Sequence, residues 1–282
     1  MGPHPHLAQR PRRSRAAAAA RSCAAPRSRT ARANAVAGSS AQNRRSGSAP
    51  TAAYSGPNRP RRPPMKIAII GAGNIGGNLT RRFAALGHDV SVANSRGPQT
   101  LADLARETGA RAVTVQDAPR GAEVLVVTIP EKNIPLLPDD LLAGAEGVVV
   151  IDTGNYYPQR DGRIDEIEDG LPESRWVECQ LGHPVVKAFN NIYAAHLLER
   201  GRPAGAEDRI ALPVAGDDAD AKALVLGLVD ELGFDAVDAG PLAESWRQQP
   251  ATPVYAADLD AAGVTRALAE ASPERPAEFR AG

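Results

Sequence analysis

Short apolar runs alternate with longer segments of helical periodicity from residue 65 onward. Several runs are almost continuously apolar, which is typical of strands covered on both faces of a parallel sheet. The predicted strands are Lys66–Ile70, Asp89–Ala93, Arg111–Thr114, Glu123–Thr128 and Gly147–Asp152. Helical segments lie between them, and this order predicts an α/β protein with a doubly wound parallel sheet.

The first predicted helix directly follows the first strand. Its apolar positions recur on one face at helical spacing, and a glycine, Gly87, ends it. These positions are Ile75, Leu79, Phe83 and Leu86. A second helix is predicted at Thr100–Thr108.

Residues from His183 onward continue the pattern. We expect Pro184–Phe189 and Arg209–Val214 to be further strands of the same sheet, followed by a helix at Asp218–Leu232. The apolar stripe of that helix is Ala221, Leu224, Val225, Leu228 and Leu232. The expected organisation is a cofactor domain at 65–182 and a short α/β segment at 183–282. The short segment has little mass to cover its apolar helical faces, so we expect a homodimer built largely from it.

A glycine-rich turn, GAGNIG, separates the first predicted strand from the first helix. In this motif Gly71 permits the tight turn, Gly73 lets a pyrophosphate approach the backbone, and Gly76 packs helix against strand. Strand, turn, helix and second strand occur in the order of a Rossmann unit. We therefore expect a dinucleotide cofactor.

The residues after the second predicted strand indicate which dinucleotide binds. An acidic residue usually stands there and binds the ribose hydroxyls of NAD. This chain has Asn94, Ser95 and Arg96 instead: a neutral amide, a hydroxyl and a planar guanidinium that suits a phosphate. The sequence therefore predicts NADP(H), with a solvated loop arginine as the alternative interpretation of Arg96.

Residues 1–64 differ in composition from the rest of the chain. They contain thirteen Arg and no Asp or Glu, which leaves 20 basic against 33 acidic side chains in the remainder. We expect this extension to be disordered, since it lacks hydrophobic periodicity, and to be inert or artefactual, because Met65 stands directly before the first strand. Targeting and polyanion binding are the alternatives. The acidic body argues against nucleic acid as a partner.

Cysteine usage and hydropathy indicate the compartment. The chain has two cysteines, Cys23 and Cys179, in different segments, and its apolar runs are strand-sized. A disulfide framework and a membrane span are therefore not expected, and we expect a cytoplasmic protein.

Few patterns for acid–base chemistry are present. No Tyr is followed four residues later by Lys, and there is no G-x-S-x-G motif. A catalytic lysine at Lys187 is possible but not favoured. Cys179 and His183 are four residues apart, but Gly182 intervenes and no third ligand is near, so we do not expect a metal site. Direct hydride transfer between two bound ring systems needs no such group at its centre.

Five stretches together resemble the NADPH:8-hydroxy-5-deazaflavin (coenzyme F-420) oxidoreductases. They are MKIAIIGAGNIGG, NSR, VVTIP, VVKAFN and PVAGDD…DAGPL, spanning Met65 to about Leu242. The N-terminal fold is shared with pyrroline-5-carboxylate reductases. The resemblance implies NADP(H) as cofactor, a homodimer, and coenzyme F-420 as the small-molecule redox acceptor.

The resemblance also implies site residues. The pyrophosphate would meet the glycine-rich turn, and the 2′-phosphate would meet Ser95 and Arg96. Thr128, Ile129 and Pro130 leave the carboxyl end of the fourth strand, where ligands of such sheets bind, and would lie along the nicotinamide ribose. The expected cofactor contacts are Gly71, Gly73, Asn74, Ile75, Gly76, Asn94, Ser95, Arg96, Thr128, Ile129 and Pro130, and the expected acceptor contacts are Lys187, Ala188 and Asn190.

This chain departs from the family pattern at two places. A second basic residue often follows the Ser-Arg pair in the family, but here Gly97, Pro98, Gln99 and Thr100 follow. The stretch after DAGPL, AESWRQQPATPVYAADLD, is also unlike the family, although Trp246 and Tyr255 could stack on a ring. A small carbonyl or imine reductase and a non-catalytic NADP(H)-binding regulatory module are therefore alternatives.

Overall fold

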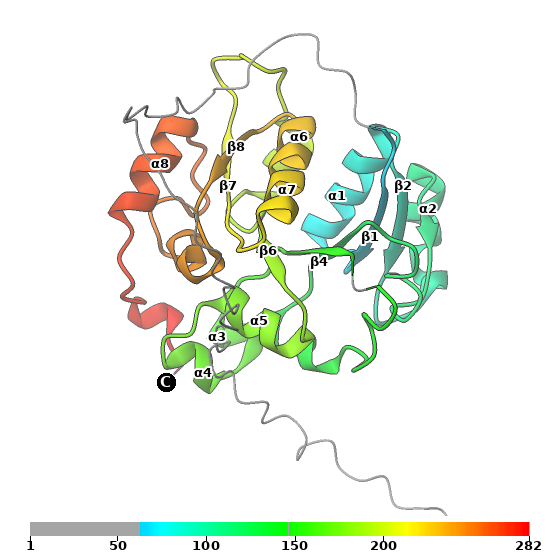
Figure 1. Ribbon diagram of the computed structural model, residues 1–282, viewed down its shortest axis with the longest axis horizontal. Helices are drawn as coiled ribbons and strands as arrows, with labels where there is room; N and C mark the ends of the chain where they lie inside the picture. The colour runs from blue at the N-terminus through cyan, green and yellow to red at the C-terminus, as the bar shows by residue number, and fades with distance from the viewer. Residues whose placement is uncertain (1–62, 146, 282) are drawn as a thin grey trace, which may run out of the picture.

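A six-stranded parallel sheet forms the centre of the protein, which is seen here in a computed structural model that describes residues 63–145 and 147–281 (Figure 1). The strand order β3-β2-β1-β4-β5-β6 is that of a doubly wound sheet, as the sequence predicted. The strands are β1 (Lys66–Ile70), β2 (Asp89–Ala93), β3 (Arg111–Ala112), β4 (Val124–Val127), β5 (Val149–Asp152) and β6 (Val185–Lys187).

Helices cover both faces of the sheet. The α-helices are α1 (Asn74–Ala85), α2 (Ala102–Thr108), α3 (Pro158–Asp161), α4 (Asp165–Glu168), α5 (Glu173–Leu181), α6 (Ala194–Glu199), α7 (Ala219–Glu231) and α8 (Ala261–Glu270). Short 3₁₀ helices are η2 (Pro98–Leu101), η3 (Glu131–Leu136), η4 (Leu242–Gln248) and η5 (Ala277–Phe279).

Alternate residues of β1 enter two different hydrophobic clusters. Ile67 and Ile69 pack with side chains of α1 and α7, whereas Ala68 and Ile70 pack with Trp176 and other residues around α5. Both faces of the strand are thus buried, which explains its continuous apolar run.

The prediction that Arg209–Val214 joins the same sheet is wrong. The strand there, β7 (Ala211–Val214), pairs in parallel with β8 (Asp235–Asp238) in a separate two-stranded sheet. A single antiparallel bridge between Lys187 and Ala215 links the end of β6 to the residue after β7. Pro213 within β7 has no N–H to donate, which disfavours a position between two hydrogen-bonded neighbours.

The segment after His183 packs onto the cofactor domain rather than standing apart. Strand β6 belongs to the large sheet, and the buried stripe of α7 joins the same cluster as α1. Arg82 of α1 donates hydrogen bonds to the carbonyl of Leu198, at 2.9 Å, and to that of Leu232. The apolar face of α7 is therefore covered within the chain. The argument for a homodimer from uncovered faces does not hold, and the homodimer stays a prediction.

The prediction of a disordered extension concerns residues 1–64, nearly all of which lie outside the described residues. Among the described residues, no helix has both the length and the apolar character needed to cross a membrane.

Candidate cofactor and acceptor site

The glycine-rich turn connects β1 to α1 at the carboxyl edge of the sheet. Gly71 has φ +109°, and a Cβ there would lie 2.2 Å from the carbonyl oxygen of Thr128. A Cβ on Gly76 would lie 1.9 Å from the carbonyl oxygen of Gly71. Backbone therefore occupies both places, and only glycine fits. Thr128 is in this way held against the turn, and Ile129 and Pro130 continue the chain from there.

Gly73 differs from the other two glycines, because a Cβ there would meet no atom within 4 Å. The space beside it lies at the N-terminus of the twelve-residue helix α1. Gly73 occupies the N-cap position without a side-chain cap, and the first turn has no acidic residue. The free N–H groups and the positive end of the helix dipole suit a phosphate group. Asn74 is exposed there, whereas the side chain of Ile75 packs against the core.

The loop after β2 is shaped by Asn94. Its Oδ1 accepts a hydrogen bond from the backbone N–H of Arg96 at 2.9 Å, and its Nδ2 donates to the hydroxyl of Thr100 at 2.9 Å. The Asn94 side chain thus fixes the conformation of the loop. The sequence had indicated only that Asn94 stands where an acidic residue usually binds the ribose. Ser95 and Arg96 are exposed, and the Arg96 guanidinium has no partner among the described residues.

A hollow of about 710 Å³ brings the turn and this loop together. Its walls come from α1, from the loop and helices after β2, and from α6. The lining residues include Gly73, Asn74, Arg81, Arg96, Thr100 and Leu198. The open helix N-terminus and the unpaired guanidinium therefore share one space, so the residues present fit a phosphate-bearing dinucleotide.

The three expected acceptor contacts lie at the end of β6. In the sheet, β5 separates β6 from β4, the strand that leads to Thr128. All three side chains are buried. Asn190 donates to the carbonyl of Gln248 at 2.6 Å and to Oδ1 of Asn155 at 3.0 Å, and accepts from Nε2 of Gln248 at 2.9 Å. Ala188 has no exposed surface. The side chains of these three residues are packed among other protein atoms and do not project into open space.

Lys187 belongs to a buried charged cluster that the sequence did not reveal. Its ammonium lies 3.1 Å from Oδ2 of Asp152 and donates to the carbonyl of Gly154 at 2.5 Å. Glu131 and Glu173 complete the cluster, and all four ionisable side chains are at most 1% exposed. They come from η3, β5, α5 and β6, so no sequence spacing indicated that they meet.

The environment shifts the pKa values in this cluster. Burial lowers the pKa of Lys187, but the carboxyls of Asp152, Glu173 and Glu131 outweigh it and the net shift is upward. Burial and the neighbouring Asp152 raise the pKa of Glu131 well above its ordinary value. Neither carboxyl oxygen of Glu131 has a hydrogen-bond partner among the described residues, which agrees with a neutral side chain.

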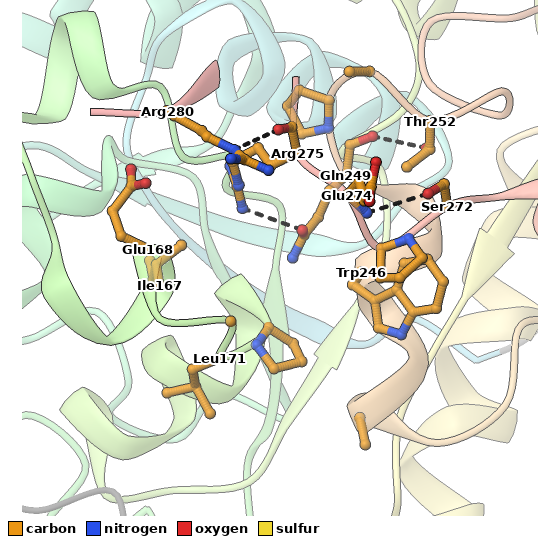
Figure 2. A pocket seen from close by; sticks show the side chains of 16 residues that line it. Ile167, Glu168, Leu171, Trp246, Gln249, Thr252, Ser272, Glu274, Arg275 and Arg280 are labelled. Atoms are coloured by element: carbon orange, nitrogen blue, oxygen red, sulfur yellow. Dashed lines mark hydrogen bonds between the residues drawn. The ribbon is translucent and has the colours of Figure 1, made fainter. Parts of the chain in front are cut away.

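A second hollow, of about 570 Å³, is lined by residues of the segments 167–172, 243–252 and 272–280 (Figure 2). In this view Trp246 of η4 and Leu171 lie on two sides of it, and Gln249 and Arg275 lie above them. Arg275 reaches from this wall to Oε1 of Glu173 at 2.9 Å. The hollow contains none of the expected cofactor contacts. Tyr255, the other aromatic residue considered for stacking, has its hydroxyl against that of Tyr157.

Cys179 lies within α5, and Gly182 ends that helix in the left-handed conformation before His183. No group of three or more His, Cys, Asp or Glu in the described parts of the chain could hold a metal ion.

The strand order and the glycine-rich turn define a Rossmann-type dinucleotide-binding fold. Residues 66–156 match the model of the family described as NADP oxidoreductase, coenzyme F420-dependent. A solved structure of a hypothetical protein, SMa0349 from Sinorhizobium meliloti, is 33% identical, with a TM-score of 0.59 over 69% of this chain and 95% of that one. The chain belongs to this family of NADP-dependent oxidoreductases.

Two further relatives are similar over shorter stretches. A putative F420-dependent NADP reductase from Arthrobacter sp. FB24 is 26% identical, with a TM-score of 0.54 over 64% of this chain and 87% of that one. Putative protein YjhV of Escherichia coli K12 is 49% identical over 66 residues, which are 23% of this chain and 48% of YjhV. The chain thus spans about half the length of that curated relative.

Proposed function

We propose that this protein transfers a hydride between NADP(H) and a deazaflavin acceptor of the coenzyme F-420 type. The observation that carries the NADP(H) half is the shared hollow, in which the open N-terminus of α1 and the unpaired Arg96 face one space. The deazaflavin half is supported by the family description and by the putative activity of the Arthrobacter relative.

In this proposal the chain's residues bind and orient. The α1 N–H groups beside Gly73 would hold the pyrophosphate, and Ser95 and Arg96 would hold the 2′-phosphate. Thr128, Ile129 and Pro130 would flank the nicotinamide ribose. The buried side chains of Lys187, Ala188 and Asn190 would exclude water from one side of the acceptor.

When bound, NADPH would supply the hydride, and the deazaflavin ring would accept it together with one proton. Lys187 is not the donor of that proton in this proposal, because its ammonium is buried between Asp152 and the carbonyl of Gly154. Solvent at the ring edge supplies it.

The acceptor is tested by following the oxidation of NADPH with a panel of a deazaflavin, a flavin, a cyclic imine and a small aldehyde. We expect turnover with the deazaflavin. Turnover with the imine or aldehyde alone would overturn the proposal in favour of a carbonyl or imine reductase. Tight NADPH binding without turnover on any acceptor would favour the regulatory module.

The cofactor half is tested with Arg96→Ala. Loss of a charge-assisted phosphate contact costs roughly 1.5–3 kcal/mol, or about ten- to a hundredfold in NADPH affinity. NADH lacks the phosphate and serves as the internal control, so its affinity should stay unchanged. Equal weakening of both cofactors, or a wild type that prefers NADH, would contradict the assignment.

A further inference from the structure

Arg81 lies two turns into α1 and lines the same hollow as Arg96. Its Nη1 lies 3.4 Å from the place a Cβ on Gly77 would take, and the carbonyl oxygen of Ala72 lies 3.8 Å from that place. The guanidinium therefore extends back along the helix toward the glycine-rich turn.

Glu107 of the neighbouring helix α2 fixes this orientation. Arg81 donates from Nε to Oε1 at 2.6 Å and from Nη2 to Oε2 at 2.9 Å, which is a two-pronged contact. Nη1 has a single long contact, 3.4 Å to Oδ1 of Asn78. Glu107 thus holds one edge of the guanidinium and leaves N–H groups of the other edge available to a ligand.

The charges around the hollow require more than one cation to hold a phosphate. Asp103, Glu107 and Glu199 line it together with Arg81 and Arg96. A phosphate monoester carries about −1.5 to −2 charges at neutral pH. One exposed arginine in acidic surroundings would balance such a group poorly, whereas two arginines that line the same hollow match its charge and its several acceptor oxygens.

We propose that Arg81, held by Glu107 in the hollow that Arg96 also lines, is a second cationic contact to the 2′-phosphate of NADP(H). This inference rests on the proposed NADP(H) function. It supplies from α1 the second basic group that the loop after Arg96 lacks, because residues 97–100 are Gly, Pro, Gln and Thr.

The test compares Arg81→Ala with two controls by titrating NADPH and NADH and following cofactor fluorescence. Arg106→Ala is the matched control, since Arg106 lies on α2 near the hollow, is 75% exposed and does not line it. Arg81→Ala should weaken NADPH binding about five- to twentyfold and leave NADH unchanged. It should also flatten the salt dependence of NADPH binding. Arg106→Ala should change neither affinity.

Glu107→Gln separates phosphate binding from simple pairing of α1 with α2. It keeps the Arg81 guanidinium and one acceptor oxygen but weakens the contact that places the guanidinium, so it should lose less of the preference for NADPH than Arg81→Ala does. The inference is overturned if Arg81→Ala weakens both cofactors alike or neither, or if Glu107→Gln weakens both cofactors alike, as a purely structural pairing of α1 with α2 would. Failure of the proposed function looks different: wild type would then show no preference for NADPH, or Arg96→Ala would have no effect.

Discussion

Replacing Lys187 by methionine removes a buried ammonium that faces three carboxyls and keeps a side chain of similar length. The side chain of Lys187 has no exposed surface and that of Asp152 is 1% exposed, so water cannot take over the lost contact. Ser174 still donates to Oδ2 of Asp152 at 2.7 Å, and Arg275 still pairs with Glu173. Asp152, however, would lose the ammonium beside it.

The magnitude follows from the burial of the pair. Removing one partner of a buried ion pair costs about 3–5 kcal/mol, because the other charge stays uncompensated. That is a large part of the roughly 5–15 kcal/mol by which a typical domain is stable. With about 2–4 °C per kcal/mol for a protein of this size, the melting temperature should fall by about 6–20 °C.

The loss should depend on pH in a defined direction. Lys187 lowers the pKa values of Glu131 and Glu173, which burial raises, so without it these two pKa values should lie further above their unfolded values and folding should take up protons. A raised carboxyl pKa costs stability as pH rises above the unfolded value near 4.5. The deficit of Lys187→Met relative to wild type should therefore be larger at pH 8 than at pH 5.

Urea unfolding at both pH values, followed by far-ultraviolet circular dichroism, measures this deficit. Lys132→Met is the matched control, since Lys132 is exposed and contacts only the carbonyl of Arg160 among the described residues, at 2.6 Å. It should change the free energy of unfolding by less than about 0.5 kcal/mol. A deficit for Lys187→Met below about 1 kcal/mol at pH 8, or one that is equal at both pH values, would refute the reasoning.

Two further predictions concern the same edge of the sheet. Because burial raises the pKa of Glu131, wild type should lose stability relative to Glu131→Gln as pH rises from 5 to 8; parallel urea-unfolding profiles for the two proteins would count against this. Gly73→Ala should keep the melting temperature but weaken NADPH binding, whereas Gly76→Ala should lose at least about 1–3 kcal/mol of stability, since its Cβ would meet backbone. Equal stability losses in thermal melts of the two glycine variants would contradict the open space beside Gly73. Unchanged NADPH affinity of Gly73→Ala would contradict a role for that space in cofactor binding.

The first βαβ unit could be predicted closely because local signals determine it. Strands β1 and β2 have the predicted bounds, and helix α1 follows the glycine-rich turn as expected. The positive φ of Gly71 and the backbone contact at Gly76 agree with the roles that the motif assigns. Here spacing, turn chemistry and apolar pattern all indicate the same local structure.

Contacts between distant segments could not be predicted in this way. Lys187 is one polar residue in an apolar run, and nothing in its neighbourhood indicates that Asp152, Glu131 and Glu173 meet it. The strand containing Pro213 matched the apolar pattern of the sheet, yet that pattern does not specify which neighbour a strand pairs with. The sequence places Arg81 in the first predicted helix, but the orientation of its side chain in the hollow depends on Glu107 of another helix.

The hollow at the phosphate end depends on residues from both sides of the expected boundary at 182. Helix α6 forms one of its walls, and Asn78 of α1 donates to the carbonyl of Ala194 at 2.7 Å where α6 begins. Arg82, further along α1, donates to the carbonyls of Leu198 and Leu232. These bonds hold the later segment against the helix whose N-terminus would bind the pyrophosphate. Because the wall formed by α6 is hydrogen-bonded to α1, the shape of the hollow follows from the packing of both segments, and the segment after β6 would contribute to cofactor binding in the proposed function.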